Sequence, residues 1–382
     1  MKIGIMLRSL DEKGGIGVYT QNITKELLEL DRNNQYILYY QNTDNLGRFG
    51  RFGNVTERVI KTKNKALWDQ LRIPLACWQD KVDVIFHPKF TVPLLAPCKA
   101  VMVLHGAGWF LPEMTQFFHP LDVRYIRMVM PLYFRKCAVA LSVSQLGAEI
   151  FTRELNLPPG KIRTVYFAPA RQFKRVTDAG KLREVKDRYN LPDRFILTLT
   201  KRGGDTRKNL GQIFRAYARY HDRVEVSYNL VVGGKDCHLF REEYSLPAEG
   251  YGADVLFPGW IDQQDLPSVY SLAELYLYPS NLEAFPVPIT EAMACGVPIV
   301  TSNVNGLKEV AGESALFIDP TSDEQIADAI ERVVTDENLR QRLSAQGLNR
   351  SKDFSWDKCA RETLDALEGV VKVANVASNR NG

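Results

Sequence analysis

The stretch EAFPVPITEAMACGVPIV, residues 283–300, decides the fold because it joins two strand patterns through one helix pattern. An apolar run at residues 275–278 precedes it, and the apolar residues 297–300 end it. Pro288 suits the first position of a helix, and Gly296 suits its C-terminal cap. A strand, a helix and a strand in this order predict a βαβ unit with two parallel strands.

The same alternation of short apolar runs and helical patterns extends through the whole chain. One array covers residues 2–166, and a second begins with the apolar run at 195–200. Two such arrays predict two doubly wound parallel sheets of Rossmann-like α/β type, each covered by helices on both faces. We expect domains at residues 1–172 and 173–354. A C-terminal helix should follow from Trp356 to about Val373.

Composition excludes several classes of protein. The 382 residues are 45% hydrophobic and 25% charged, which is typical of a globular chain and not of a disordered or fibrous one. The six cysteines are scattered without a CxxC pair, so they predict neither a zinc ribbon nor a disulfide framework and suit a reducing compartment. No window holds 18 apolar residues, and the N-terminal apolar run is too short for a signal peptide. We therefore expect a cytoplasmic protein.

Charge is distributed unevenly along the chain. Residues 1–180 carry 25 Lys and Arg against 15 Asp and Glu, whereas residues 181–382 carry 24 against 30. The basic half suits an anionic membrane, an anionic acceptor or nucleic acid, although no nucleic-acid motif occurs. Residues 121–136 predict a basic amphipathic helix, which suits the inner face of an anionic membrane. An ordinary core-facing helix with solvated charges would show the same pattern.

Two carboxylates flank the start of the helix within residues 283–300. Glu283 precedes the helix and Glu291 lies one turn inside it. Free N–H groups at a helix N-terminus attract an anion, and nearby carboxylates can accept hydrogen bonds from sugar hydroxyls. Alternatively, both are surface residues, with Glu291 favoured by the helix dipole.

Two cations follow the first strand of the second array. Arg202 and Lys208 precede a predicted helix at 209–220 and could clamp a diphosphate, with Lys201 or Arg207 sharing the arginine's role. A solvated basic loop is the alternative. No Asp-x-Asp triplet and no His/Cys cluster occurs, so we predict a site that needs neither a metal nor another cofactor.

Further candidates lie at strand ends in the first array. Gly15 and Gly17 belong to a glycine-rich loop that would let the backbone approach a ligand, although it lacks the GxGxxG spacing of a dinucleotide site. His105 ends the run at 100–104 and could be functional or structural. His87 and Lys89 follow the run at 82–86 and could touch an acceptor.

The motif Glu283-x7-Glu291, followed by Ala-Met-Ala-Cys-Gly-Val-Pro-Ile-Val, resembles the signature of the GT-B glycosyltransferases of family GT4. The similarity extends over most of the chain. It implies retaining transfer of a hexosyl group from a nucleotide-diphosphate sugar, with UDP-glucose ahead of GDP-mannose, to a glycan or lipid-linked glycan acceptor in polysaccharide or glycolipid biosynthesis. It also implies an acceptor domain and a donor domain facing across a cleft, with helix 355–382 crossing back to the first.

The resemblance assigns roles to individual residues. The implied catalytic set is Arg202, Lys208, Glu283 and His105. The implied donor-binding set is Gly15, Gly17, Trp260, Ile261, Phe285, Val287 and Glu291. Ala284 and Pro286 depart from the family's usual glycines, and Pro286 has no N–H to offer the donor. A UDP-sugar epimerase or hydrolase, or a nucleotide-sugar-binding or dehydrogenase-like protein, is therefore the alternative function.

Overall fold

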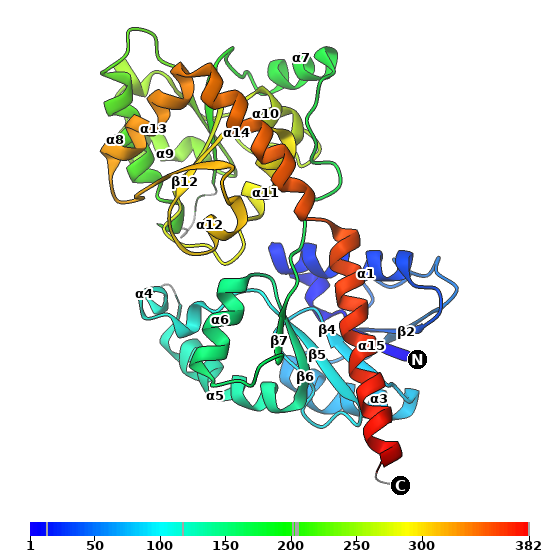
Figure 1. Ribbon diagram of the computed structural model, residues 1–382. Coiled ribbons are helices and arrows are strands. Elements are labelled where there is room, and N and C mark those ends of the chain that lie inside the picture. The colour runs from blue at the N-terminus through cyan, green and yellow to red at the C-terminus, as the bar shows by residue number, and fades with distance from the viewer. Residues whose placement is uncertain (13, 117, 201, 203–205, 381–382) are drawn as a thin grey trace. The chain divides into compact units, whose positions relative to one another are not determined.

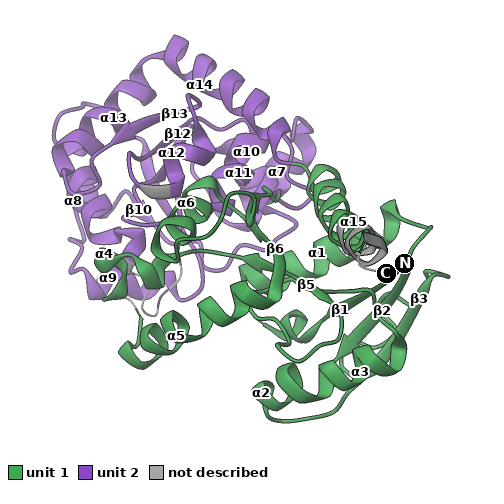
Figure 2. Cartoon of the chain, turned by 60° about the horizontal axis from the view of Figure 1, so that its bottom comes forward, with its two compact units in different colours: residues 1–167, 355–382 green, residues 168–354 purple. Residues whose placement is uncertain are grey.

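The computed structural model divides the chain into two compact units, residues 1–167 with 355–382 and residues 168–354 (Figure 2). It describes residues 1–380 except 13, 117, 201 and 203–205. Each unit is built on one parallel sheet, as the alternation of apolar runs and helical patterns predicts. Within the described part of the chain, the six cysteines are buried free thiols.

Unit 1 contains a sheet of seven strands in the order β3-β2-β1-β4-β5-β6-β7. Its strands are β1 (Lys2–Met6), β2 (Gln35–Tyr40), β3 (Val55–Val59), β4 (Val84–His87), β5 (Lys99–Leu104), β6 (Cys137–Ser142) and β7 (Ile162–Thr164). Its α-helices are α1 (Gly15–Leu30), α2 (Lys65–Leu67), α3 (Ile73–Asp80), α4 (Pro112–Thr115), α5 (Pro120–Lys136), α6 (Gln145–Glu154) and α15 (Trp356–Arg380). The strand order reverses direction between β1 and β4, which makes this pair the topological switch point.

Helices cover both faces of the unit 1 sheet. Ile73 of α3, Met130 of α5 and Phe151 of α6 share one buried core cluster. The C-terminal helix α15 packs beside α1 (Figure 1), where the Trp356 ring lies 5.8 Å from the Tyr19 ring. The chain thus returns to unit 1 after it has completed unit 2, as the sequence predicts for this C-terminal helix.

Unit 2 contains a sheet of six strands in the order β10-β9-β8-β11-β12-β13, with its switch point between β8 and β11. Its strands are β8 (Phe195–Leu199), β9 (Asn229–Gly233), β10 (Val255–Leu256), β11 (Leu275–Tyr278), β12 (Ile299–Ser302) and β13 (Ala315–Ile318). Its α-helices are α7 (Ala179–Arg188), α8 (Leu210–His221), α9 (Phe240–Glu243), α10 (Leu266–Leu272), α11 (Val287–Cys295), α12 (Asn305–Ala311), α13 (Asp323–Thr335) and α14 (Glu337–Arg350).

Local structure differs from expectation in three places. Helix α7 occupies a charge-rich stretch after the expected domain boundary in which the sequence pattern predicts no helix, and α15 continues to Arg380 beyond the expected end near Val373. Helix α11 begins at Val287, so Pro288 is its second residue and not its first. Gly296 ends α11 with φ +75°, the left-handed conformation that its predicted capping role requires.

Candidate active site

Lys208 and Glu283 form an ion pair at the β8/β11 switch point of unit 2. Lys208 Nζ lies 2.6 Å from Glu283 Oε1, and both side chains are largely buried. The Tyr278 hydroxyl donates to the same carboxylate oxygen at 2.6 Å, and Lys208 Nζ lies 4.2 Å from the centroid of the tyrosine ring. Residues from the ends of two neighbouring strands are thus joined where ligands of open α/β sheets bind.

Asn209 fixes the loop that carries Lys208. It adopts φ +60°, and its side-chain amide donates to the carbonyl oxygens of Pro279 (3.2 Å) and Pro320 (2.6 Å). The Asn281 N–H also donates to the Arg207 carbonyl oxygen at 2.8 Å. These bonds hold three loops at the carboxyl edge of the sheet together, which restricts the position of the Lys208 ammonium group.

Gly306 fixes the loop that carries Glu283. Its N–H donates to the Glu283 carbonyl oxygen at 3.1 Å, and a Cβ atom at residue 306 would lie 2.5 Å from the Ala284 carbonyl oxygen. Only glycine permits that approach without a backbone shift. The first turn of α12 therefore supports the Glu283 loop directly.

The start of α11 offers fewer hydrogen-bond donors than the sequence suggests. Pro286 and Pro288 have no N–H, the Val287 N–H donates to the Phe285 carbonyl oxygen (3.1 Å), and that of Ile289 donates to Pro286 (3.0 Å). An anion beside Glu283 would therefore depend mainly on Lys208. We predicted that free N–H groups at the start of α11 would attract an anion. That prediction is wrong, because the two prolines have no N–H and the other two N–H groups are already hydrogen-bonded locally.

Glu291 lies on α11 in a partly buried setting. Burial raises the pKa of its carboxyl group to about 7, although the Tyr270 hydroxyl donates to it at 3.3 Å and opposes the rise. Burial disfavours the ionised form of Glu291, so ligand hydroxyl groups that donate hydrogen bonds to this carboxylate would stabilise it.

Replacing Glu291 with glutamine should stabilise the protein at alkaline pH. The pKa of Glu291 is higher in the folded state than the ordinary 4.5, so its contribution to stability is complete below about 4.5 and is lost as pH rises through about 7. We expect Glu291→Gln to melt roughly 3–6 °C above wild type at pH 8.5, with the difference shrinking toward pH 5.5. Calorimetry at both values checks this, and a pH-independent difference would contradict it.

The other unit 2 candidates make contacts of their own. Arg202 pairs through Nε with Glu243 Oε2 at 2.9 Å, and both side chains are exposed. Trp260 is 63% exposed, whereas Ile261 is buried against Gly233. Phe285 packs its ring 5.8 Å from that of Phe354. Lys201, the alternative to Arg202, lies outside the described residues.

The unit 1 candidates gather near the carboxyl edge of its sheet. His105 Nε2 lies 2.9 Å from the Pro88 carbonyl oxygen, and burial lowers the pKa of the imidazole to about 4, so it is neutral at pH 7. Gly15 begins α1 in open surroundings. Gly17 is tightly packed, since a Cβ there would lie 2.0 Å from the Glu12 carbonyl oxygen. His87 is 1% exposed, and Lys89 pairs with Glu12 at 2.6 Å.

Tyr278, Asn209 and Gly306 were missed at the sequence level. Tyr278 ends an apolar strand and so its pattern predicts a core residue. Asn209 lies in the loop before α8 and Gly306 lies in the first turn of α12, and neither belongs to a motif. An asparagine at the start of a helix pattern is the one available signal for Asn209, because asparagine tolerates the left-handed conformation.

Within the described residues, no group of three or more His, Cys, Asp and Glu side chains converges as a metal site would require. No described helix is long and apolar enough to cross a membrane.

Two doubly wound parallel units in one chain are the architecture that the GT-B class of glycosyltransferases shares, and the comparisons assign the class. The family model of glycosyl transferases group 1 matches residues 183–350, which lie within unit 2. The O-antigen chain mannosyltransferase B of Escherichia coli is 31% identical over 301 residues, covering 76% of this chain and 75% of that protein. The chain therefore belongs to the group 1, GT4-type glycosyltransferases of GT-B fold.

Two further comparisons agree with this assignment. The serotype-specific mannosyltransferase WbdA of Escherichia coli is 30% identical over 275 residues, covering 71% of this chain but only 33% of that protein. The crystal structure of Anabaena HepE in complex with UDP-glucose matches with a TM-score of 0.72 at 16% identity, covering 97% of this chain and 100% of that one. At that identity the second match supports the fold alone.

Proposed function

We propose that this glycosyltransferase moves a mannosyl group, with retention at the anomeric carbon, from a nucleotide-diphosphate sugar to a glycan or lipid-linked glycan acceptor. The observation that carries the proposal is the Lys208–Glu283 pair at the β8/β11 switch point. Unit 2, where the family model matches, would bind the donor, and unit 1 would bind the acceptor.

Charge development explains why this pair suits glycosyl transfer. Breaking the glycosidic bond places negative charge on the departing diphosphate oxygen, and a fixed ammonium group stabilises that charge in a low-dielectric setting. Lys208 would supply it, Glu283 would accept hydroxyl hydrogens of the donor sugar, and Glu291 would accept those of the ribose. Arg202 would turn from Glu243 toward the diphosphate, which its exposed side chain permits. The departing oxygen would take the acceptor proton on the same face of the sugar.

Donor choice is the finer part of the proposal. The sequence alone favours UDP-glucose over GDP-mannose as the sugar donor. However, two of the curated relatives are named mannosyltransferases. We therefore place GDP-mannose first. No metal-ligating group enters the reaction as proposed.

A direct assay tests the proposal against its alternatives. The purified chain is incubated with GDP-mannose or UDP-glucose and a mannose-terminated oligosaccharide, with and without EDTA, and products are followed by NMR. We expect an α-linked mannosyl product from GDP-mannose at an EDTA-independent rate. Release of free sugar or epimerised nucleotide sugar, regardless of acceptor, would favour the hydrolase or epimerase. Nucleotide binding without turnover would favour a binding protein, and loss of activity in EDTA would contradict metal independence.

A peripheral membrane attachment through α5 is the second part of the proposal. Leu121, Tyr125, Met128 and Leu132 are 43–68% exposed and repeat at helical spacing along one face. The exposed Arg124, Arg127 and Arg135 lie on the same helix. Exposed apolar side chains beside cations suit the interface of an anionic bilayer, which fits a lipid-linked acceptor.

Replacing Met128 with glutamate should weaken binding to vesicles that contain anionic lipid. Burial of a methionine side chain in the interface contributes about 1.5–3 kcal/mol, so we expect the partition coefficient to fall at least about tenfold. Val226, which is 79% exposed in unit 2, provides the matched control Val226→Glu. Co-sedimentation measures both, and equal binding by the two variants would rule out α5 as the attachment surface.

A further inference from the structure

Two buried thiols of unit 1 lie on segments that meet at the amino edge of its sheet. Cys77 belongs to α3, and its carbonyl oxygen accepts from the Val82 N–H at 3.0 Å just before β4 begins. Cys98 immediately precedes β5, which pairs with β4 from Lys99 opposite Val84 onward. Both thiols belong to one buried core cluster. The path of the chain from α3 into β4 therefore places the first thiol beside the start of β5.

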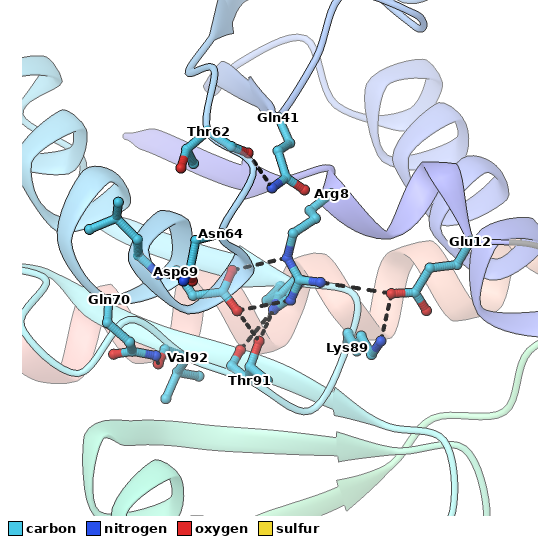
Figure 3. Close-up of polar contacts among 12 residues, drawn as sticks. Arg8, Glu12, Gln41, Thr62, Asn64, Asp69, Gln70, Lys89, Thr91 and Val92 are labelled. Atoms are coloured by element: carbon cyan, nitrogen blue, oxygen red, sulfur yellow. Dashed lines mark hydrogen bonds and ion pairs between the residues drawn. The ribbon is translucent and has the colours of Figure 1, made fainter.

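The loop between β4 and β5 is fixed against the turn that leads into α3 (Figure 3). That turn, a π-helix at Trp68–Arg72, contains Gln70. The Gln70 side-chain amide donates to the Val92 carbonyl oxygen at 3.0 Å and accepts from the Leu94 N–H at 2.9 Å. Because these bonds join the two segments that carry the thiols, the position of one thiol relative to the other is restricted.

A hydrogen bond joins the two thiols directly. It lowers the pKa of Cys98 and, together with burial and the charge of Asp80, raises the pKa of Cys77. The Lys136 ammonium group donates to the Ala96 carbonyl oxygen at 2.5 Å, and its positive charge also lowers the pKa of Cys98. Cys98 therefore ionises more readily than an ordinary thiol, whereas Cys77 keeps its proton and donates it to Cys98.

The other four thiols are in a different electrostatic setting. Burial raises the pKa of each of them, namely Cys137, Cys237, Cys295 and Cys359. Cys98 also lies between two exposed residues, Pro97 and Lys99, and is itself 8% exposed. A small oxidant can reach such a thiol where a bulky reagent cannot. Ready ionisation, access for a small molecule and a second thiol in contact are the features of cysteines that oxidants convert to disulfides.

We propose that Cys98 and Cys77 are a redox-active pair that hydrogen peroxide converts to a disulfide. The Cys98 thiolate attacks one peroxide oxygen, so that an S–O bond forms, the O–O bond breaks and hydroxide leaves. The Cys77 sulfur then attacks the sulfenic acid, the S–S bond forms, and the displaced hydroxide leaves with the thiol proton as water. In total, two thiols and one peroxide give one disulfide and two water molecules. This chemistry is independent of the proposed transferase function.

The disulfide ties α3 to the start of β5. It closes a loop that contains the end of α3 and the whole of β4, and so removes freedom from the unfolded chain. The turn before α3 also carries Asp69, which accepts from Arg8 at 3.1 and 2.8 Å, and both residues are at most 6% exposed. Oxidation thus restrains a part of unit 1 that is anchored at its other end by a buried ion pair.

Peptide mapping of the full-length chain tests the proposal without any substitution. Reduced protein is treated with hydrogen peroxide at neutral pH, denatured, alkylated with iodoacetamide and digested without reductant. We expect mass spectrometry to find the peptides of Cys77 and Cys98 joined, lighter by two hydrogens than the sum of the free peptides and released by dithiothreitol. The other four cysteines should be alkylated.

Variants assign a role to each member of the pair and to the lysine. Cys77→Ser removes the second thiol, so the sulfenic acid at Cys98 should persist and be trapped by dimedone. Lys136→Met keeps both thiols, and we expect disulfide formation to slow roughly tenfold because a smaller fraction of Cys98 is ionised. Lys136→Arg keeps the charge and should restore the rate. Lys61→Met, which removes an exposed cation elsewhere in unit 1, is the matched control and should react like wild type.

Three outcomes would overturn the inference. The first is alkylation of Cys77 and Cys98 in wild type to the same extent as the other four thiols. The second is a disulfide that joins either residue to a different cysteine or to a second molecule. The third is oxidation of Cys98 to the sulfinic acid while Cys77 stays free. Equal rates for Lys136→Met and Lys61→Met would contradict the role given to the lysine charge. The mapping of wild type remains decisive even if a variant fails to fold.

Discussion

Replacing Lys208 with methionine should lower the transfer rate by about 100- to 1,000-fold, the usual loss when one electrostatic donor to a developing charge is removed. Methionine keeps the length and apolar stem of the side chain while removing the ammonium group that contacts Glu283 and the Tyr278 ring. The effect should fall mainly on kcat, because the diphosphate gains charge as the bond breaks. Single-turnover transfer from GDP-mannose measures it.

Two controls separate chemistry from folding. Lys352→Met removes an exposed cation elsewhere in unit 2 and should leave the rate unchanged. The double variant Lys208→Met/Glu283→Gln removes both charges, so it should melt closer to wild type than Lys208→Met alone, which leaves a largely buried carboxylate unpaired. The double variant also lacks the proposed sugar contact of Glu283, so it reports on stability alone. A Lys208→Met variant that is folded at the assay temperature but has lost the rate would assign the loss to catalysis. A near-normal rate in Lys208→Met would contradict the proposed diphosphate role.

Replacing Gly17 with alanine should strongly destabilise unit 1. The new Cβ atom would lie 2.0 Å from the Glu12 carbonyl oxygen and 3.5 Å from that of Ser9, and backbone cannot move aside as a side chain can. Overpacking of this severity costs about 3 kcal/mol or more. For a unit of this size, that lowers the melting temperature by roughly 6–12 °C. Scanning calorimetry of the full chain measures the shift.

Gly15→Ala is the matched control for this change. Residue 15 begins the same helix, and a Cβ atom there would have no neighbour within 4 Å. Its melting temperature should stay at or slightly above that of wild type, because alanine loses less chain entropy on folding. Equal melting temperatures for the two variants would show that the loop at residues 9–12 yields easily.

The sequence predicts the two-sheet architecture well because buried parallel strands read as apolar runs. The charged helix α7 was not predicted. Its one buried residue is Val185, so its sequence shows almost no apolar stripe. The same weakness affects the end of the chain, where the polar composition after Val373 suggested fraying and the helix continues to Arg380.

The candidate site was predictable only where a family motif marks it. Glu283 and Lys208 are 75 residues apart, and their choice rests on the resemblance and on their places after two strands. Arg8 and Asp69 are 61 residues apart, and no motif contains either. Sheet topology brings them together, and burial of an ion pair is a property that a single sequence does not display.

The burial of all six thiols makes this protein a convenient background for attaching probes. Buried cysteines are inaccessible to a bulky reagent, and burial raises the pKa of Cys137 and Cys359 to about 12, whereas a hydrogen bond with Cys77 lowers the pKa of the buried Cys98. A pair of cysteines introduced at exposed positions, one in each unit, would therefore be the groups that a maleimide dye modifies under native conditions. Energy transfer between two such dyes would report whether donor nucleotides change the separation of the units in solution.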